Sequence, residues 1–476
     1  MKMSNIRKKL VSLAVASAVT GGAMMMAAPA HAMNVSQDNV GQVLLFPYYT
    51  VKNGFDTVFT VTNVSNYTAV FKVRFREALN SREVRDFNVI LSPNDHWGAA
   101  VTTTTDGALV RTYDKTCTSP RLPGMVSNAD RATAGVKGEV AFTNALYTGI
   151  YADGASQAMD RVQEGYFEVI LMGVSDAATN VALNTLEYNA KHVDGVPRDC
   201  AVVDNLFLDV GANLSYMAAP ENILKGHVTY INVVNGQAID AEPTAIENFT
   251  ANNIVYAPGD ALPDLGSAED DQVVYFLNNG APEGGPVAGS SENAVSVLLS
   301  ANSVINEFAT GAGASTSWVL TFPTKHHYTD GTLRAPFSST FTNKSCDPFE
   351  MDMFNREEAT AVNVDNTNFS PAPPEGGPNT ICYEANVLNF NGTSVFGIVG
   401  ANHKGVSTAD VGTAGWARIR FSGFTVDGNP VEPTLSGVVG LPAIGFAAIM
   451  RDADSAIVNY GSSTEHTISR AMAVPQ

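Results

Sequence analysis

The amino-acid sequence predicts an all-β protein, a large antiparallel β-sandwich with long inserted loops and one covering helix. Short runs in which apolar and polar residues alternate, or that are wholly apolar, recur along the chain, and such runs are typical of strands. Turn-forming residues separate them, as at Asn235-Gly236. A helical apolar period is clear only at residues 291–310. Many short strands with long turns favour two stacked sheets.

The first strands lie within residues 41–103. The clearest is residues 70–76, in which apolar and basic side chains alternate: Phe71, Val73 and Phe75 with Lys72, Arg74 and Arg76. This period of two predicts a strand with one face in the core and a basic face in water. In an acidic chain, the basic face is either the solvated side of the strand or a contact for an acidic neighbouring subunit or a surface polysaccharide.

Turn residues separate these strands and predict an antiparallel meander. Asn53-Gly54 favours an immediate hairpin between residues 41–50 and residues 57–62. The apolar strand 41–50 has a second option, because an unpaired sheet edge on a neighbouring molecule can accept an added strand. Pairing within its own chain is the default, and exchange between molecules is the alternative if the protein builds a filament.

The middle of the chain alternates loops with strands. Residues 104–161 are rich in Thr, Ser, Gly and Pro and predict a decorated loop region. Residues 164–173, EGYFEVILMG, form a short apolar run typical of a strand buried on both faces. Further strands are expected at residues 205–214 and at residues 225–240, the latter folded into a hairpin at Asn235-Gly236. Residues 242–250 favour one or two helical turns.

Pro and Gly predict a loop at residues 257–289, before the one convincing helix. Ser291 can cap this helix, Glu292 suits its positive end, and Gly311 can end it. Its apolar stripe consists of Val295, Leu298, Leu299, Ile305 and Phe308. The remaining strands are expected at residues 318–322, 337–342, 385–390, 417–421 and 441–449, with a Pro- and Gly-rich loop at residues 371–378.

The first 32 residues read as a secretory signal peptide. Basic residues precede an apolar segment, and Ala30-His31-Ala32 places small side chains where signal peptidase selects them. We therefore expect cleavage between Ala32 and Met33. The remaining residues 33–476 would form one large β-rich body or two lobes that meet near residue 250, and the lack of a low-complexity linker or repeat favours one body.

The net charge of the 476-residue chain is −19 at pH 7. This balance argues against nucleic acid and anionic lipid as partners. After residue 32 no window reaches the ~18 uninterrupted apolar residues of a spanning helix, so we expect no integral membrane segment. We expect an exported protein at the cell surface or outside the cell, with the periplasm as the fallback.

Four cysteines remain after residue 32, in a compartment where thiols oxidise. Three pairings are possible, and we expect the local one, Cys117 with Cys200 and Cys346 with Cys382. Metal binding is the competing use of cysteine, but it usually shows as short CxxC-like spacing. The shortest gap in this chain is between Cys346 and Cys382.

No sequence motif with a known catalytic mechanism is present: the chain has no HExxH, GxSxG, phosphate loop, dinucleotide fingerprint or CxxC. Adjacent residues of a strand face opposite ways, so His326 and His327 would reach one metal ion only in a turn. Two acidic groups offer the oxygen ligands that calcium uses, Glu269-Asp270-Asp271 and Asp452 with Asp454. Neither matches the spaced calcium loop, and composition alone produces such groups in an acidic chain. We expect no cofactor, with calcium as the alternative.

Several blocks in a fixed order resemble a group of secreted proteins of Gram-negative bacteria described only as cell surface proteins. The blocks are GQVLLFPYYTVKNGFDT, VRFREALNSREVRDFNVILSP, EGYFEVILMG, WVLTFPTKHHYTDG, the stretch from Cys346 to Glu358, CYEANVL and LPAIGFA. The resemblance covers nearly the whole chain after residue 32. It implies export and surface exposure, and it implies no catalytic residue. The LPAIG stretch departs from a sortase signal because it lacks Thr and a following apolar, basic-ended tail.

These observations lead us to expect a non-enzymatic surface protein that contributes to an extracellular layer, filament or adhesive coat. Its partners would be further copies of itself or a cell-surface polysaccharide. A binding module for an extracellular carbohydrate or other ligand is the first alternative. A secreted hydrolase is the second, because an all-β body can bring two carboxylates together in space without a sequence signature.

Overall fold

The computed structural model describes residues 32–175, 186–208, 217–268, 271–358, 360–361, 379–397, 400–421, 424–426, 429–452 and 459–473. The protein is mostly β, with 46% strand and 13% helix, which confirms the predicted all-β class. Residues 1–31 of the expected leader and the loop at residues 371–378 lie outside the described residues, as do Glu269, Asp270 and Asp454.

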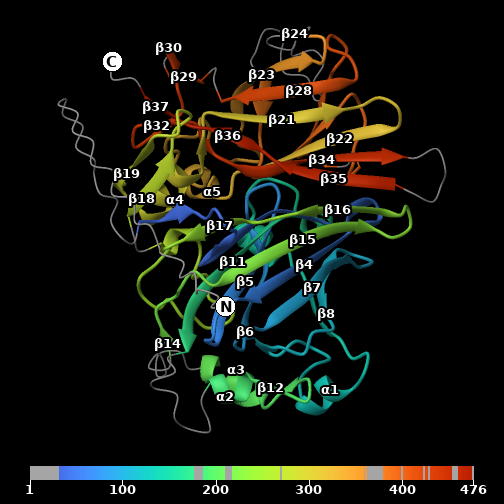
Figure 1. The fold of residues 1–476 in the computed structure, drawn as a ribbon, viewed down its shortest axis with the longest axis vertical. Helices are drawn as coiled ribbons and strands as arrows, with labels where there is room; N and C mark the ends of the chain where they lie inside the picture. The colour runs from blue at the N-terminus through green and yellow to red at the C-terminus, as the bar shows by residue number, and fades with distance from the viewer. Residues whose placement is uncertain are drawn as a thin grey trace, which may run out of the picture.

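Strands before residue 248 build two facing sheets, drawn in blue to green in Figure 1. The eight-stranded sheet has the order β1 (Asn34–Val35), β17 (Thr244–Glu247), β3 (Val43–Thr50), β11 (Glu164–Ser175), β5 (Ala69–Glu77), β6 (Glu83–Leu91) and β9 (Cys117–Ser119), with β14 (Met217–Ala218) beside β11. The seven-stranded sheet has the order β10 (Gly138–Ala141), β8 (Ala108–Thr112), β7 (His96–Thr103), β4 (Asp56–Asn63), β15 (Leu224–Asn232) and β16 (Gln237–Ala241), with β2 (Val40–Gly41) beside β15.

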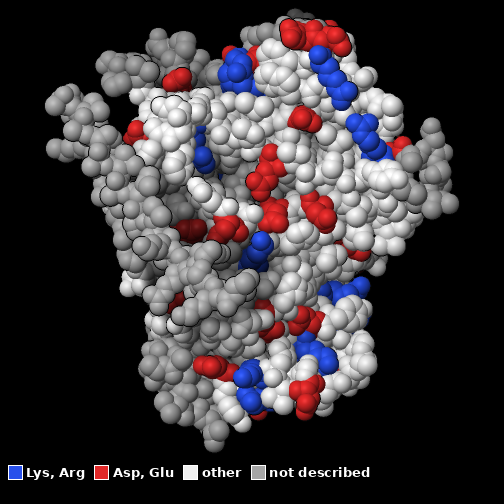
Figure 2. Space-filling model, in the orientation of Figure 1, with Lys and Arg blue, Asp and Glu red and all other residues white. Residues whose placement is uncertain are grey.

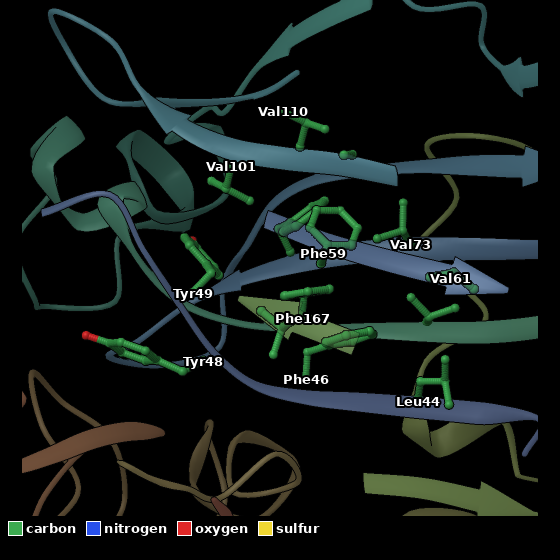
Figure 3. Packing of buried hydrophobic residues seen from close by; sticks show 14 of the residues in the cluster. Leu44, Phe46, Tyr48, Tyr49, Phe59, Val61, Val73, Val101, Val110 and Phe167 are labelled. Atoms are coloured by element: carbon green, nitrogen blue, oxygen red, sulfur yellow. The ribbon is translucent and has the colours of Figure 1, made fainter. Parts of the chain in front are cut away.

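Aromatic side chains fill the space between these two sheets, as Figure 3 shows. Phe46 of β3 stacks on Phe167 of β11 with the ring centroids 4.2 Å apart, and Phe59 of β4 packs against both rings. All twelve residues of β11 and all eight of β3 are buried. The prediction that residues 164–173 form a doubly buried strand is therefore confirmed.

Strands after residue 300 build a second pair of sheets, drawn in yellow to red in Figure 1. The six-stranded sheet has the order β24 (Thr360–Ala361), β23 (Asp347–Asn355), β28 (Ala414–Arg420), β21 (Ser303–Ala309) and β36 (Thr467–Ser469), with β25 (Asn379–Ile381) beside β23. The five-stranded sheet has the order β27 (His403–Val406), β26 (Ala385–Phe390), β22 (Ala314–Thr321), β34 (Ile444–Asp452) and β35 (Asn459–Glu465).

Short elements complete the described chain. The helices are α1 (Asn128–Ala132), α2 (Leu186–Ala190), α3 (Cys200–Leu208), α4 (Ser291–Leu299) and α5 (His326–Thr329). The 3-10 turns are η1 (Lys52–Gly54), η2 (Ala145–Tyr147), η3 (Gly149–Tyr151), η4 (Met159–Gln163) and η7 (Leu265–Ser267). Small pairings join β12 (His192–Val193) to β13 (Val196–Pro197), β18 (Gln272–Phe276) to β19 (Pro282–Pro286), β20 (Ser300–Ala301) to β33 (Leu441–Pro442), β29 (Phe424–Val426) to β30 (Asn429–Val431), and β31 (Thr434–Leu435) to β32 (Val438–Val439) and β37 (Ala471–Met472).

We call the pair of sheets before residue 248 the first half and the pair after residue 300 the second half. The two halves lie against each other, and β16 of the first runs beside β35 of the second (Figure 1). Asn459 of β35 donates to the carbonyl of Asn235, and Ser463 donates to the carbonyl of Asp240. The core between the first two sheets also continues into the second pair through Val319, Val387 and Phe446. Whether the chain forms one domain or two stays a prediction. Among the described residues, no helix has the length and apolar character needed to cross a membrane.

The predicted meander is wrong, because β3 and β4 lie in different sheets. β3 pairs with β17 and β11, whereas β4 pairs with β7 and β15. The turn at Asn53-Gly54 has the expected positive φ values, 56° and 83°, but it carries the chain from one sheet to the facing one. A wholly apolar strand such as β3 is suited to an interior position with neighbours on both edges.

The predicted helix at residues 291–310 is nine residues long and ends at Leu299. Ile305 and Phe308 belong to β21 instead, where Val304 and Phe308 point into the core and Ile305 and Glu307 point outward. The β-branched residues after Leu299 fit this two-residue period. α4 packs on the eight-stranded sheet as expected of a covering helix, but it is one of five helices in the described chain.

Four shorter assignments are also corrected. Residues 244–247 form β17 instead of helical turns, and residues 200–208 form α3 where a strand had been expected from residue 205. The expected loop at residues 257–289 contains the β18–β19 hairpin, and the expected strand at 337–342 is irregular. In the first two cases tertiary packing outweighed weak local preferences. The β15–β16 hairpin and β26, by contrast, confirm the prediction.

Candidate functional site

The basic side chains of β5 are buried, so the predicted wet face is wrong. Lys72 and Arg74 are each 1% exposed and Arg76 is 7% exposed. Their side chains pair across neighbouring strands: Lys72 with Asp86 at 3.0 Å, Arg74 with Glu83 at 2.8 Å and Arg76 with Glu168 at 2.9 Å. Acidic residues on both flanking strands thus neutralise the cations inside the protein, and the three side chains offer no contact surface.

A strap of residues 256–263 covers these cations. Lys72 Nζ donates to the carbonyls of Ala257, Asp260 and Leu262 at 2.8–3.2 Å. Arg74 donates to the carbonyls of Asp260 and Pro263. Burial lowers the pKa of Lys72, and the Asp86 carboxylate opposes that change. The cations therefore supply the donors that an irregular segment needs for its buried carbonyl groups.

His326 and His327 lie on the short helix α5, with their ring centroids 4.0 Å apart. His326 Nδ1 is 4.0 Å from Glu384 Oε2. Burial lowers the pKa of both imidazoles; His327 and nearby arginines lower that of His326 further, whereas the Asp264 carboxylate opposes the change at His327. The described part of the chain contains no group of three or more His, Cys, Asp or Glu side chains that could hold a metal ion. The pair is therefore a half-buried, neutral group.

Glu384 is fully buried, and the Ser81 side chain lies beside its carboxylate. Burial raises the pKa of Glu384 to about 8, although the Lys325 ammonium acts in the opposite direction. At neutral pH this carboxyl is therefore mostly protonated. Its backbone joins the halves, because the Glu384 amide donates to the carbonyl of Ala78 at 3.0 Å.

A second group of buried ionic side chains also bridges the halves. Glu164 of β11 accepts hydrogen bonds from Tyr48, from Lys52 Nζ at 2.8 Å and from His403 Nε2 of β27 at 2.6 Å. Burial would raise the pKa of Glu164, but the charges of His403 and Lys52 outweigh it and lower the pKa to about 2. Glu164 is therefore an ionised buried carboxylate with several donors. We call these four residues the Glu164 clasp.

The first half also contains a buried ionic triad, Arg161 with Glu77 and Asp153. Arg161 donates two hydrogen bonds to Glu77 at 2.7 and 2.8 Å and two to Asp153 at 2.6 and 2.9 Å. Asp153 also lies 3.5 Å from Arg82, whose guanidinium reaches Asp330 of the second half. Glu77 and Asp153 each accept from two nitrogens of the Arg161 guanidinium, a geometry that fixes loops in place.

The two disulfides are those predicted. Cys117 bonds Cys200, and Cys346 bonds Cys382. The first attaches α3 to the edge strand β9, and the second ties the start of β23 to the segment before β26. Both pairings are therefore local.

The remaining predicted residues do not come together in a site. Asp271 and Asp452 are exposed, and neither belongs to a metal-ligand group among the described residues. Calcium at the clusters that include Glu269, Asp270 and Asp454 stays a prediction. Ala32 and Met33 are buried; the Met33 amide donates to the Gln272 carbonyl at 2.8 Å, and the Val274 amide donates to the Met33 carbonyl at 2.9 Å. The expected new chain end would thus be part of the fold.

A crevice of about 310 Å³ lies beside this N-terminal segment. Its lining includes Gln42, Asn222, Asn248 and Thr250. The amides bind one another and the backbone: Asn222 donates to Asn248 Oδ1, Gln42 donates to the Pro220 carbonyl, and Asn248 donates to the Ala32 carbonyl. These bonds hold the loops around β2 and β17 together. The amides that line the crevice therefore stabilise the fold, and we do not assign a ligand to it.

Sequence reasoning missed the bridges between the halves because their members are far apart in the chain. Glu164 and His403 are 239 residues apart, and no local pattern connects them. The one available signal was Glu164 itself, a charged residue at the start of an otherwise apolar strand, because a buried charge requires a partner.

Comparison with known proteins identifies no relative. A scan against protein-family models found no match, and searches of curated proteins and of solved structures found no similar protein either.

Proposed function

We propose that the chain is an exported, non-enzymatic protein of the cell surface that contributes to an extracellular layer, filament or adhesive coat. The Glu164 clasp carries the proposal, because it is a costly buried charge group whose members are used in joining the two halves. A large β body held together in this way suits a protein that has to keep its shape outside the cell.

Two further features support export. Disulfides such as Cys117–Cys200 and Cys346–Cys382 persist in oxidising compartments. The net charge of −19 keeps an exported protein soluble through self-repulsion. Figure 2 shows acidic and basic side chains scattered over the face in view, without a broad basic surface that would attract nucleic acid.

Electron microscopy of washed cells and shed material tests the proposal. A deletion strain should lose a layer, filament or coat that the parent strain shows, and expression of the chain from a plasmid should restore it. Purified protein that cleaves polysaccharides or esters would contradict the non-enzymatic part. An unchanged cell surface in the deletion strain would contradict the structural part.

A further inference from the structure

The outer face of the six-stranded sheet carries a stacked aromatic pair in which Trp416 is exposed and Phe354 is half-buried. Phe354 of β23 and Trp416 of β28 are directly opposite in register, and their rings stack with centroids 4.3 Å apart and planes 14° apart. Trp416 is 38% exposed. Because Phe354 covers one face of the indole, its exposed area lies on the opposite face and the edge.

On the side away from Phe354, Trp416 lies next to β21. Its register partner there is Glu307, which is exposed, and the next outward residue is Ile305, which is half-buried. An exposed carboxylate, an apolar floor and an indole face therefore lie within one small area. We call Trp416, Glu307 and Ile305, with the Arg418 side chain next along β28, the Trp416 shelf.

Two rows of ion pairs between β23 and β28 lie beside the Trp416 shelf on the same outer face of the sheet. Arg418 and Arg420 bind Asp352 at 2.8 and 2.7 Å, and Arg420 also binds Glu350 at 2.8 Å. Asp352 is 2% exposed, whereas both arginine side chains are about one third exposed. The guanidinium groups thus keep outward N–H groups while their charge is neutralised from below. With Glu307 included, the face carries slightly more negative than positive charge.

We propose that the Trp416 shelf binds a neutral polysaccharide chain. A sugar ring has one face of C–H groups, which are attracted to the negative face of an indole. Its hydroxyl groups need acceptors and donors beside that face, and Glu307 and Arg418 provide one of each. Because the arginines are already paired and the chain is acidic, an anionic glycan would be repelled. A neutral ligand is therefore the occupant that this surface fits.

This inference deepens the proposed function and rests on it for its biological setting, since a coat or adhesive protein needs a partner at the surface. Its test uses purified full-length protein. A negative binding result therefore contradicts only the glycan proposal, and an unchanged cell surface in the deletion strain contradicts only the proposed function.

Tryptophan fluorescence reports this surface selectively. The chain has three tryptophans, and Trp97 and Trp318 are fully buried. Acrylamide quenching therefore measures mainly Trp416. The probes are laminarin, dextran and yeast mannan as neutral glycans and alginate as an acidic one, used both in quenching titrations and in affinity electrophoresis.

We expect at least one neutral probe to protect Trp416 from acrylamide and to retard the protein in the gel, and alginate to do neither. Trp416→Ala should weaken this binding by about tenfold, as expected for loss of one stacked aromatic contact. Trp416→Phe should retain most of it. Tyr460→Ala is the matched control, because Tyr460 is a 64% exposed aromatic residue on β35. This variant should bind the neutral glycans as well as the wild type does.

Thermal unfolding and near-ultraviolet circular dichroism establish that each variant is folded. The proposal is overturned if no neutral probe binds, if alginate alone binds, or if folded Trp416→Ala binds as well as the wild type. Light scattering on the same proteins tests the competing occupant. If the wild type is a dimer that Trp416→Ala converts to a monomer, a second copy of the chain covers the shelf and the glycan proposal is wrong.

Discussion

Glu164 and His403 share a buried hydrogen bond of 2.6 Å although they are 239 residues apart in the chain. Glu164 begins the central strand β11 of the first half, and His403 begins the edge strand β27 of the second. Lys52 completes the charge balance from the turn between β3 and β4. One carboxylate thus connects three segments whose relation is invisible in the sequence.

Replacement of Glu164 tests how much this clasp stabilises the fold. Glu164→Gln leaves the Lys52 ammonium and the His403 imidazole without their anionic partner, so the free energy of unfolding should fall by about 3–5 kcal/mol at pH 7. The pKa of Glu164 is lowered to about 2 in the folded protein. Its stabilising effect is therefore complete above about pH 4.5 and is lost as the pH falls toward 2.

Urea unfolding at pH 7 and at pH 3 measures both effects. The difference between wild type and Glu164→Gln should shrink at the lower pH. Glu139→Gln serves as the control, because Glu139 is 30% exposed in a surface pair with Arg111, and it should change stability by less than about 1 kcal/mol. Equal behaviour of the two variants would show that the clasp is not stabilising.

His466 predicts a second pH effect. Burial lowers the pKa of this imidazole to about 4, while Asn306 and the Val319 carbonyl hold its ring nitrogens. Between pH 6.5 and 4 the unfolded chain binds the proton that the folded protein excludes. The wild-type free energy of unfolding should therefore decrease over this range by up to about 3 kcal/mol from this group.

His466→Gln removes that titration. Urea unfolding at half-unit steps from pH 7 to pH 4 should give a shallower slope for this variant than for the wild type. His96→Gln alters an exposed histidine and should leave the slope unchanged. Identical slopes in all three proteins would argue that His466 is hydrated or protonated in the folded state.

Lys72 is predicted to hold the strap of residues 256–263. Lys72→Met keeps an apolar stem but leaves the Ala257 and Leu262 carbonyls of the strap without a donor and Asp86 without its nearest cation. We expect a loss of at least about 3 kcal/mol in the free energy of unfolding. We also expect faster chymotrypsin cleavage after Tyr256, the first residue of the strap, read by mass spectrometry.

Lys137→Met is the control for this substitution, since Lys137 is 40% exposed and pairs with Glu139 at the surface. If the strap resists chymotrypsin equally in the wild type and in Lys72→Met, the buried cation does not hold it.

The disulfides should stabilise the protein to different extents. Their loops span 83 and 36 residues, for which chain entropy gives upper figures of about 4.5 and about 4 kcal/mol. The double variants Cys117→Ala/Cys200→Ala and Cys346→Ala/Cys382→Ala should each unfold at lower urea concentration than the wild type. Non-reducing peptide mapping of exported protein checks the pairing, and free thiols or a bridge between the halves would contradict it.

Strand β3 gives the fifth prediction. It lies between β17 and β11 with all eight residues buried, so it belongs to the core of its own chain in this structure. Deletion of residues 33–50 should abolish folding, seen as loss of near-ultraviolet circular dichroism. A folded monomer after this deletion would support the alternative that the strand is donated to a neighbouring molecule.

The alternation in residues 70–76 predicts a strand correctly but predicts its burial incorrectly. A period of two shows that Phe71 and Lys72 face opposite ways. It does not show what covers each face. The partners Asp86 and Glu168 come from flanking strands that are chosen by the tertiary fold, and the strap lies still further along the chain.

The same limit explains the other differences. Asn53-Gly54 specifies a turn, but a turn can join neighbours in one sheet or strands in facing sheets. In the sequence, Leu299 and Ile305 fit one helical stripe. In the structure, the helix ends at Leu299 and Ile305 belongs to β21, which begins at Ser303. The local disulfide pairing was predictable because chain separation does bear on it. The Glu164 clasp was not, because its members are related only in space.

Immunogold electron microscopy of unpermeabilised cells is the most direct test that this chain is a surface protein of an extracellular layer, filament or coat. With antibodies against the purified protein, gold should follow a structure outside the outer membrane of the parent strain and should disappear together with that structure in the deletion strain. Label found only after permeabilisation, with the same outer surface in both strains, would contradict the proposal.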